Sequence, residues 1–280
     1  MAITNFISTI WSENLYRELD KQYIAVSHCS RDFEGDIKNV GSTVKICGVG
    51  AVGVSDYTKN TDMSTPQDLS DTVTTLKIDR AKYFNFQIDD IDRAQSTPKL
   101  MEAAMSIAAS ALANETDKYI FSLFSEAQSN VCCENVTPEN ILDNIIMARQ
   151  KLYENNVLDA SDIVIEVSPQ IASVILRAKI DLSTDNSASL EAGYLGSIAG
   201  CKIYVSNNIK QEELNDSFHH MCFVRTKRAI AFAEQLSEIE AYRPEKRFAD
   251  AVKGLHLYGA KVVYPQELVC LELGLPIVIE

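Results

Sequence analysis

The sequence lacks the features that define several broad classes of protein. Among its 280 residues, no window approaches 18 consecutive uncharged apolar residues, so no membrane-spanning helix is expected. Residues 1–10 carry neither Lys nor Arg ahead of an apolar core and show no small-residue cleavage pattern, which argues against a signal peptide. We therefore expect a soluble protein that is made in a cytosol and has no membrane partner.

Cysteine and histidine occur without the spacings of metal or disulfide sites. The seven cysteines are odd in number and contain no C-x-x-C, so most are expected to be small core residues. None of the four histidines has a ligand-type residue at metal-binding spacing. No catalytic residue, metal site or cofactor site is predicted, and the chain is not expected to be an enzyme.

Basic charge is also scarce. The chain has 26 Lys and Arg against 39 Asp and Glu, a net charge of -13 at pH 7, which disfavours tight binding of the whole surface to nucleic acid. Residues 225–261 are the only basic segment of any length, with eight basic and five acidic residues. A contact with phosphates is expected only there.

One glycine motif suggests an enzyme. Gly48, Gly50 and Gly53 spell G-x-G-x-x-G directly after a predicted strand at 43–46, as in dinucleotide-binding proteins. That chemistry needs a helix that opens at the motif, yet residues 54–71 are rich in Thr, Ser, Asp and Asn. The pattern favours a glycine-softened strand that bends into a long loop, with an NAD-dependent oxidoreductase as the alternative.

The longest helical pattern runs from residue 97 to residue 128. Thr97 is a suitable N-cap and Pro98 a suitable first-turn residue. Apolar residues recur at three- and four-residue intervals from Met101 to Leu123, whereas Ser110 and Asp117 fall on the polar side. This pattern predicts a rigid spine helix with one apolar face.

Shorter elements are predicted on both sides of the spine. Leu15 and Leu19 belong to a short amphipathic helix within an arm that we expect to stay outside the core. Strands at 43–46 and from residue 72 onward are joined by a long polar loop, and 128–136 is a break. Further helices start at Thr137 and Ser168, and 183–200 is a loop. Strands are expected at 162–167, 202–205, 221–224, 229–233, 237–242, 251–263 and 268–271.

This layout resembles the major capsid protein of tailed bacteriophages, which has the Hong Kong 97-type fold. The resemblance covers nearly the whole chain. It is carried by three parts of the sequence: DFEGDIK at 32–38; DYTKN at 56–60 with LKID at 76–79 and KYFNF at 82–86; and EAYRPEKRFAD at 240–250. It implies an α+β fold with an N-terminal arm, an extended β-hairpin, a peripheral domain and an inserted α/β axial domain.

The resemblance also implies domain boundaries. The N-terminal arm would span 1–42 and the extended hairpin 43–80. The peripheral domain would combine 81–135 with 233–264 and include a spine helix at 98–127. The axial domain would combine 136–232 with 265–280. Such a chain would assemble with itself, as pentamers and hexamers, into the icosahedral head shell of a virion made in a bacterial host cytoplasm.

The implied partners are a separate scaffolding protein, a portal and, weakly and without sequence preference, packaged double-stranded DNA. Since the spine begins by residue 98, no room is expected for a long cleaved scaffold region. No isopeptide crosslink from Lys59 is expected, because 233–263 contains no Asn. Assembly contacts are expected at Asp56, Tyr57, Lys59, Asn60, Asp68, Arg80, Lys82, Arg243, Glu245, Lys246 and Arg247.

Two alternatives besides the oxidoreductase stay open. A cellular nanocompartment shell protein of the encapsulin type shares the fold and packages an enzyme instead of DNA. A plain α/β binding protein would form no particle.

Overall fold

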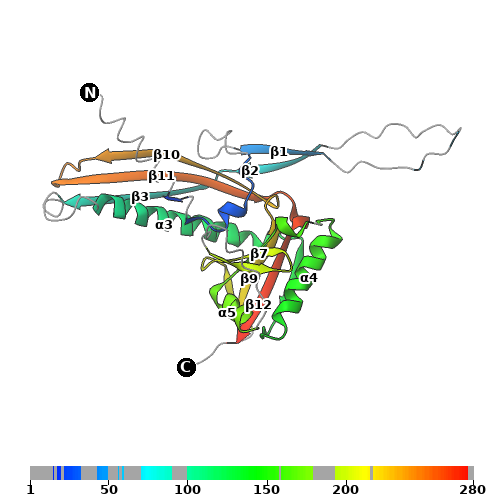
Figure 1. The fold of residues 1–280 in the computed structure, drawn as a ribbon. Helices are drawn as coiled ribbons and strands as arrows, with labels where there is room; N and C mark the ends of the chain where they lie inside the picture. The colour runs from blue at the N-terminus through cyan, green and yellow to red at the C-terminus, as the bar shows by residue number, and fades with distance from the viewer. Residues whose placement is uncertain are drawn as a thin grey trace.

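The structure is a computed structural model. It describes residues 15, 18–19, 22–32, 43–49, 56, 59, 71–89, 100–157, 159–178, 193–214 and 217–276. Two sheets organise these residues: a long three-stranded sheet with a helix beneath it, and a seven-stranded sheet that forms a separate lobe with two helices (Figure 1). The chain is therefore a mixed helix and sheet protein, as the sequence predicts.

The three-stranded sheet is antiparallel throughout. Its order is β10-β11-β3, with bounds Ile230–Tyr242, Ala249–Val262 and Arg80–Asp89. Helix α3 (Leu100–Phe121) runs along one face of this sheet (Figure 1). The opposite face is called the outer face below.

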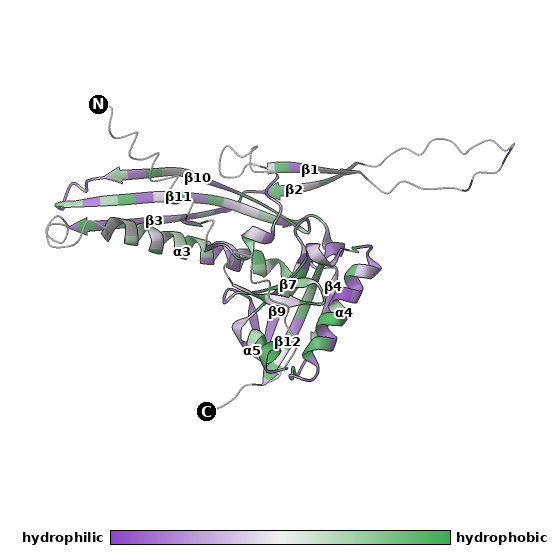
Figure 2. Cartoon of the chain, in the orientation of Figure 1, coloured by the Kyte–Doolittle hydropathy of each residue, from purple (hydrophilic) through white to green (hydrophobic). Residues whose placement is uncertain are grey.

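The seven-stranded sheet mixes parallel and antiparallel pairs. Its order is β4-β12-β9-β5-β7-β6, and β8 pairs with β9. Helices α4 (Ile141–Glu154) and α5 (Pro169–Arg177) belong to this lobe. Figure 2 shows α4 with both hydrophobic and hydrophilic residues, as expected for a helix with one buried face. The strands are β4 Ser129–Cys133, β5 Ile163–Val167, β6 Tyr194–Ile198, β7 Cys201–Val205, β8 Gln211–Leu214, β9 Ser217–Thr226 and β12 Leu268–Pro276.

The hairpin of β1 (Thr43–Val49) and β2 (Asp71–Lys77) confirms the predicted strand pair. Its register places Thr43 opposite Lys77. A small apolar cluster joins the hairpin to the outer face at the β10–β11 end; its members are Val44, Ile46, Leu76, Ile78, Ala231, Ala233 and Leu257. The hairpin is thus anchored at its base to its own subunit.

Several local predictions are confirmed. The apolar positions predicted for α4, namely Ile141, Ile145, Ala148 and Leu152, are all buried. The hydroxyl of Ser168 accepts a hydrogen bond from the backbone N–H of Ile171 and so caps α5, whose first residue is Pro169. The α4 start is corrected by a few residues, because Thr137 to Asn140 form a turn and the helix begins at Ile141.

The spine helix differs from its prediction in length and in its buried face. α3 ends at Phe121 and continues as a 3₁₀ helix, Ser122–Glu126, where the Ser122 hydroxyl donates to the Tyr119 carbonyl. Ile107, assigned to the apolar face, is 70% exposed, whereas Asp117, assigned to the polar face, is buried. The predicted cap at residues 97 and 98 lies outside the described residues.

The N-terminal segment is not confined to an arm outside the core. Leu15, Leu19, Tyr23, Val26 and Cys29 are all buried in the main hydrophobic cluster. A short 3₁₀ helix, Val26–His28, lies within this segment. The prediction was wrong because the polar residues that follow hide how much apolar surface the segment brings to α3 and the sheets.

Four segments of the chain have a secondary structure that differs from the prediction. Residues 72–88 divide into β2 and β3 of different sheets, whereas 229–233 and 237–242 form a single strand, β10, with a β-bulge between Leu236 and Glu238. A bulge shifts the alternation of side chains, which is why β10 was predicted as two strands. The predicted break at 128–136 holds β4, and the loop at 183–200 ends in β6. Two short 3₁₀ helices, Ala160–Asp162 and Pro265–Glu267, precede β5 and β12.

Two of the predicted domain boundaries, at 135/136 and 232/233, do not coincide with the limits of the sheets. β4 lies before residue 135, yet it pairs with β12 in the seven-stranded sheet. β10 starts at Ile230, three residues before the predicted boundary.

The first glycine of the motif, Gly48, lies in β1 of the antiparallel β1–β2 hairpin. Gly48 pairs with Thr72, whereas Gly50 and Gly53 lie outside the described residues. A dinucleotide fingerprint follows a strand of a parallel sheet, so the described part of the motif lacks its required context. None of the helices that the structure describes is long and apolar enough to cross a membrane.

Candidate assembly surface and the buried junction that supports it

A buried polar cluster, called the junction below, lies where the N-terminal segment meets α3 and both sheets. Charged and polar groups are rare in protein cores unless each finds a partner. A buried cluster of this kind therefore has either a structural or a functional role. Its members are Tyr23, His28, Arg31, Asp117, Glu166, Arg225, Glu234 and His256.

Glu166 and Arg225 form the part of the junction that lies on the seven-stranded sheet. Both side chains are fully buried, and Arg225 donates from Nε to Oε2 and from Nη2 to Oε1, each at 2.9 Å. Arg225 also donates to the carbonyls of His28 and Ala25 in the N-terminal segment. Burial opposes ionisation of Glu166, yet Arg225 and His28 hold the pKa of its carboxyl below the usual value.

Glu234 is the counterpart on the three-stranded sheet. It accepts hydrogen bonds from the hydroxyl of Tyr23 at 2.5 Å and from the guanidinium of Arg31, and its Oε2 lies 2.9 Å from Nε2 of His256. Burial of Glu234 is offset by these partners, which lower the pKa of its carboxyl. Burial beside Glu234 raises the pKa of Tyr23, so that side chain stays a hydrogen-bond donor.

Asp117 ties α3 to the same N-terminal segment. Its carboxylate accepts backbone N–H bonds from Ile24, Ala25 and Val26 at 3.1 to 3.3 Å. Burial raises the pKa of Asp117 to about 7, although these three donors favour the charged form. In addition, Ser30 pairs with Ala231 as a short parallel bridge at the edge of β10.

The junction is a structural device. Each of its carboxylates accepts hydrogen bonds from groups of the same chain, which hold it in place. Because one short segment is bonded to α3 and to both sheets, the junction fixes the angle between the two parts of the molecule.

Sequence reasoning missed this cluster, although a signal was present. Glu166 stands within the apolar run Ile163–Val167, and Glu234 directly follows a run of apolar residues. An acid at a buried strand position requires a partner. The identity of that partner cannot be read from spacing, because Arg225 is 59 residues away from Glu166.

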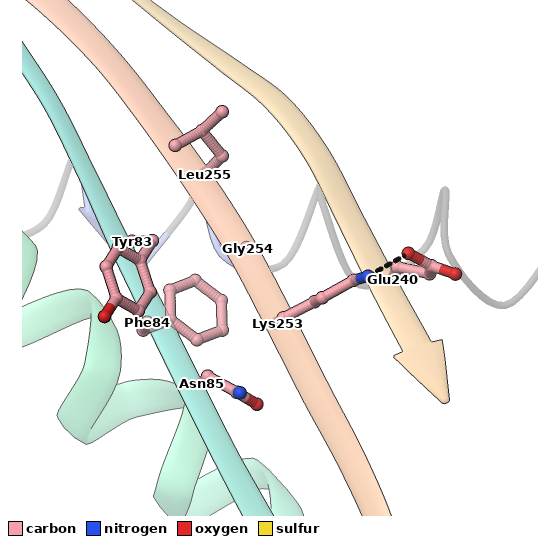
Figure 3. A pocket seen from close by; sticks show the side chains of 7 residues that line it. All are labelled: Tyr83, Phe84, Asn85, Glu240, Lys253, Gly254 and Leu255. Atoms are coloured by element: carbon pink, nitrogen blue, oxygen red, sulfur yellow. Dashed lines mark ion pairs between the residues drawn. The ribbon is translucent and has the colours of Figure 1, made fainter. Parts of the chain in front are cut away.

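The outer face of the three-stranded sheet is covered by the hairpin at one end and carries a pocket farther along. The pocket has a volume of about 250 Å³, and Figure 3 shows its lining: Tyr83, Phe84, Asn85, Glu240, Lys253, Gly254 and Leu255. Lys253 and Glu240 form an ion pair at 2.7 Å across it. A Cβ on Gly254 would lie 2.4 Å from the ring of Phe84, so only glycine lets that ring cross β11.

Two large aromatic side chains are exposed in this region. Tyr83 is 78% exposed beside the pocket, and Phe248 is 85% exposed between β10 and β11. Exposed aromatic groups of this size are typical of surfaces that become buried in an assembly.

The predicted assembly residues fall into three groups. Asp56 and Lys59 are exposed, whereas Tyr57, Asn60 and Asp68 lie outside the described residues. Glu245, Lys246 and Arg247 are all exposed in the turn between β10 and β11. The remaining group comprises Arg80, Lys82 and Arg243.

The members of that remaining group contact their own subunit. The Arg80 guanidinium lies 4.9 Å from the ring centre of Tyr119 on α3. Lys82 pairs with Glu115 of α3 at 3.2 Å, and Arg243 pairs with Asp250 at 3.2 Å. Lys82 and Arg243 thus each have an acidic partner within the chain.

The basic segment at 225–261 presents less positive charge than its sequence suggests. Arg225 is buried in the junction, so it cannot contribute to a basic surface. Four more of its basic residues have acidic partners: Arg228 with Glu267, Arg243 with Asp250, Lys253 with Glu240 and Lys261 with Glu126. The exposed basic charge of this segment is therefore divided into small clusters such as Lys246 with Arg247.

The cysteines and histidines follow their predictions in part. Cys29, Cys201, Cys222 and Cys270 are buried, as expected of small core residues, but Cys132 is exposed. His219, for which spacing indicated no ligand role, lies with Cys132 and Glu272 in a group that could hold a metal ion. The three residues come from different strands, so no local sequence motif could reveal them.

The whole chain can be compared with known proteins. No protein-family model and no curated protein sequence matches it. Solved structures do match. A structure from Mycobacterium phage Che8 is similar with a TM-score of 0.70 and 28% identity, covering 89% of this chain and 91% of that one.

Two further structures share the fold at low identity. The capsid of Ralstonia phage GP4 matches with a TM-score of 0.70 and 10% identity over 94% of this chain and 92% of that one. A virus-like particle from Pyrococcus furiosus matches with a TM-score of 0.57 and 10% identity over 97% and 100%. Phage capsids dominate the structures that resemble this chain.

Proposed function

We propose that this chain is the structural subunit of a phage head, which assembles with copies of itself into the icosahedral shell around the genome. The observation that carries the proposal is the likeness of nearly the whole fold to phage capsid structures. The role is structural rather than catalytic, and its place is the virion. Synthesis in a bacterial cytoplasm belongs to the same proposal.

The two parts of the molecule would serve different contacts. The seven-stranded lobe would act as the axial domain, around which pentamers and hexamers form. The three-stranded sheet with α3 would act as the peripheral domain, and the β1–β2 hairpin would extend onto a neighbouring subunit. The junction supports this division, because it holds both parts at one angle and so would set the curvature of the shell.

The uncovered part of the outer face would receive a neighbouring subunit. The same face already binds the base of the chain's own hairpin through apolar contacts. Tyr83 is exposed beside the pocket, and Phe248 is exposed in the turn at the far end of β10 and β11; both rings offer apolar surface to a neighbour. Repeated contacts of this kind add steeply once a closed shell fixes their geometry.

Other partners follow from the same proposal. A separate scaffolding protein and a portal would take part in assembly. Packaged double-stranded DNA would be touched weakly at exposed basic clusters, because most of the surface is acidic.

Electron microscopy of the purified protein tests the proposal. We expect closed shells in the wild type, formed alone or with the scaffolding protein. Tyr83→Ala with Phe248→Ala should lower the yield of regular shells, while unfolding of the separated subunit by urea changes little, because both side chains are exposed in it.

The matched control changes an exposed apolar residue elsewhere, Ile107→Ala on α3. Its shell yield should stay closer to that of the wild type. Absence of any particle under all assembly conditions would contradict the shell proposal. Equal shell yields for the double variant and the wild type would contradict the proposal that the outer face contacts a neighbouring subunit.

The nanocompartment alternative shares the shell and differs in its contents. A virus-like particle is among the similar structures, but phage capsids are more numerous among them and reach higher TM-scores. Extraction of DNA rather than a packaged enzyme from native particles would decide for the phage head.

A further inference from the structure

We propose that Cys132, His219 and Glu272 form a binding site for a divalent transition-metal ion of the Zn²⁺ type. Each residue offers one ligand atom, and these atoms all lie within 4.8 Å of one another. The site lies on the seven-stranded sheet, away from the outer face of the three-stranded sheet. It goes beyond the proposed function, because nothing in a shell subunit requires it.

The sheet register brings the three residues to one face. Cys132 on β4 is the parallel partner of Glu272 on β12. His219 on β9 stands opposite Gly274, two residues along β12 from Glu272. Because side chains at every second position of a strand share a face, all three project to the same side of the sheet.

Hydrogen bonds orient two of the ligands. Nδ1 of His219 lies 2.9 Å from Oε1 of Glu272. The other oxygen of Glu272 accepts a hydrogen bond from the Asn130 side chain at 3.1 Å. A ligating carboxylate is commonly held in this way by a neighbouring donor, which fixes its orientation.

Burial differs among the ligands in a way that suits metal entry. The His219 side chain is 4% exposed and that of Glu272 is 16% exposed, whereas Cys132 is exposed. The imidazole and carboxylate are thus held within the sheet, and the thiol side is open to solvent. An ion can reach the site from that side.

Gly274 provides the space in which His219 packs. A Cβ at this position would lie 3.1 Å from Nε2 of His219 and 2.3 Å from the backbone oxygen of Glu134. Any larger residue would displace the strand or the imidazole. The glycine thereby keeps His219 beside Glu272.

The donor set selects the class of metal. One thiolate sulfur, one imidazole nitrogen and one carboxylate oxygen suit Zn²⁺ or Co²⁺ and not Ca²⁺ or Mg²⁺, which prefer oxygen alone. Three protein ligands leave a fourth tetrahedral position for water. Binding replaces the thiol proton of Cys132 with the ion and releases that proton to solvent.

Titration of the reduced full-length chain with Co²⁺ tests the proposal. We expect a thiolate-to-cobalt charge-transfer band in the near ultraviolet that saturates at one ion per chain and is displaced by Zn²⁺. Cys132→Ser should abolish the band. Asn130→Ala should weaken binding about 10- to 100-fold, the range for loss of a residue that orients a ligand.

The matched control is Cys133→Ser, because Cys133 is the next residue of β4 and, pairing with Leu273, faces the opposite side of the sheet. That variant should keep the band. Alkylation followed by mass spectrometry gives a second readout, in which Zn²⁺ should protect Cys132 alone. No band in the wild type, or a band lost equally in both serine variants, would overturn the site.

Discussion

The junction and the turn between β10 and β11 use charge in opposite ways. In the junction, Glu166 and Arg225 are fully buried and every carboxylate is matched by donors from the same chain. In the turn, Lys246 and Arg247 are exposed to solvent. A buried charge must stay beside its partner, because separating the two leaves an uncompensated charge in the core, and this requirement fixes the positions of both side chains. An exposed charge has no such requirement and can contact other molecules.

The largest expected effect comes from breaking the buried pair. Glu166→Gln should lower the free energy of unfolding by about 3–5 kcal/mol, because the Arg225 charge then stays buried without its partner. Urea unfolding of the separated subunit measures this. The control is Lys82→Gln, which breaks the exposed pair with Glu115 and should cost at most about 1 kcal/mol. If both variants lose similar free energy of unfolding, burial does not make the Glu166–Arg225 pair more important for stability than the exposed pair.

A second prediction concerns the pH dependence that the junction confers. Burial raises the pKa of Asp117 from 3.8 to about 7 in the folded chain. Between these values the folded state binds more protons than the unfolded state, so this group makes stability fall as pH rises. Asp117→Asn keeps an acceptor oxygen but does not titrate.

We therefore expect the unfolding free energy of the wild type to decline, relative to that of Asp117→Asn, by about 2–4 kcal/mol between pH 4.5 and 7, at 1.36 kcal/mol per pKa unit. Parallel urea titrations of the two proteins across that range measure the difference. Parallel pH profiles would mean that the three backbone donors keep Asp117 ionised throughout.

The smallest effect on folding is expected at the turn. Lys246→Glu with Arg247→Glu should change subunit stability by less than about 0.5 kcal/mol, because both side chains are exposed. It should reduce DNA retention in filled particles. The control reverses the charges of Lys202 and Lys210, which are exposed outside the 225–261 segment. If retention is unchanged, or falls equally in the control, the turn does not contact DNA.

Local elements were predictable from the sequence where residues only a few positions apart determine the structure, as in helical periodicity and helix capping. Ile141, Ile145 and Leu152 recur at helical spacing and are buried, and Ser168 caps the helix that follows it. The face of α3 was not predictable in this way. Asp117 looks like a surface residue until the N-terminal segment supplies three backbone donors to bury it.

The candidate sites show the same limit. The glycine motif has the right spacing, but its described residue, Gly48, lies in an antiparallel hairpin. The metal-ligand group has no sequence motif and lies on three adjacent strands. Lys82 and Arg243 are predicted from the sequence as assembly contacts. Their partners within the chain became visible only when α3 and β11 were placed.

By itself the sequence determined the mixed helix and sheet class, the hairpin strands, the helices α4 and α5 and the resemblance to phage capsid proteins. The tertiary structure decided which charges are buried, how the N-terminal segment joins the two sheets and which side chains meet at the metal-ligand group. The physical reason is the separation along the chain of the residues that interact. Helical and strand periodicity are set by residues a few positions apart, whereas Glu166 and Arg225 meet across 59 residues through the pairing of β5 with β9.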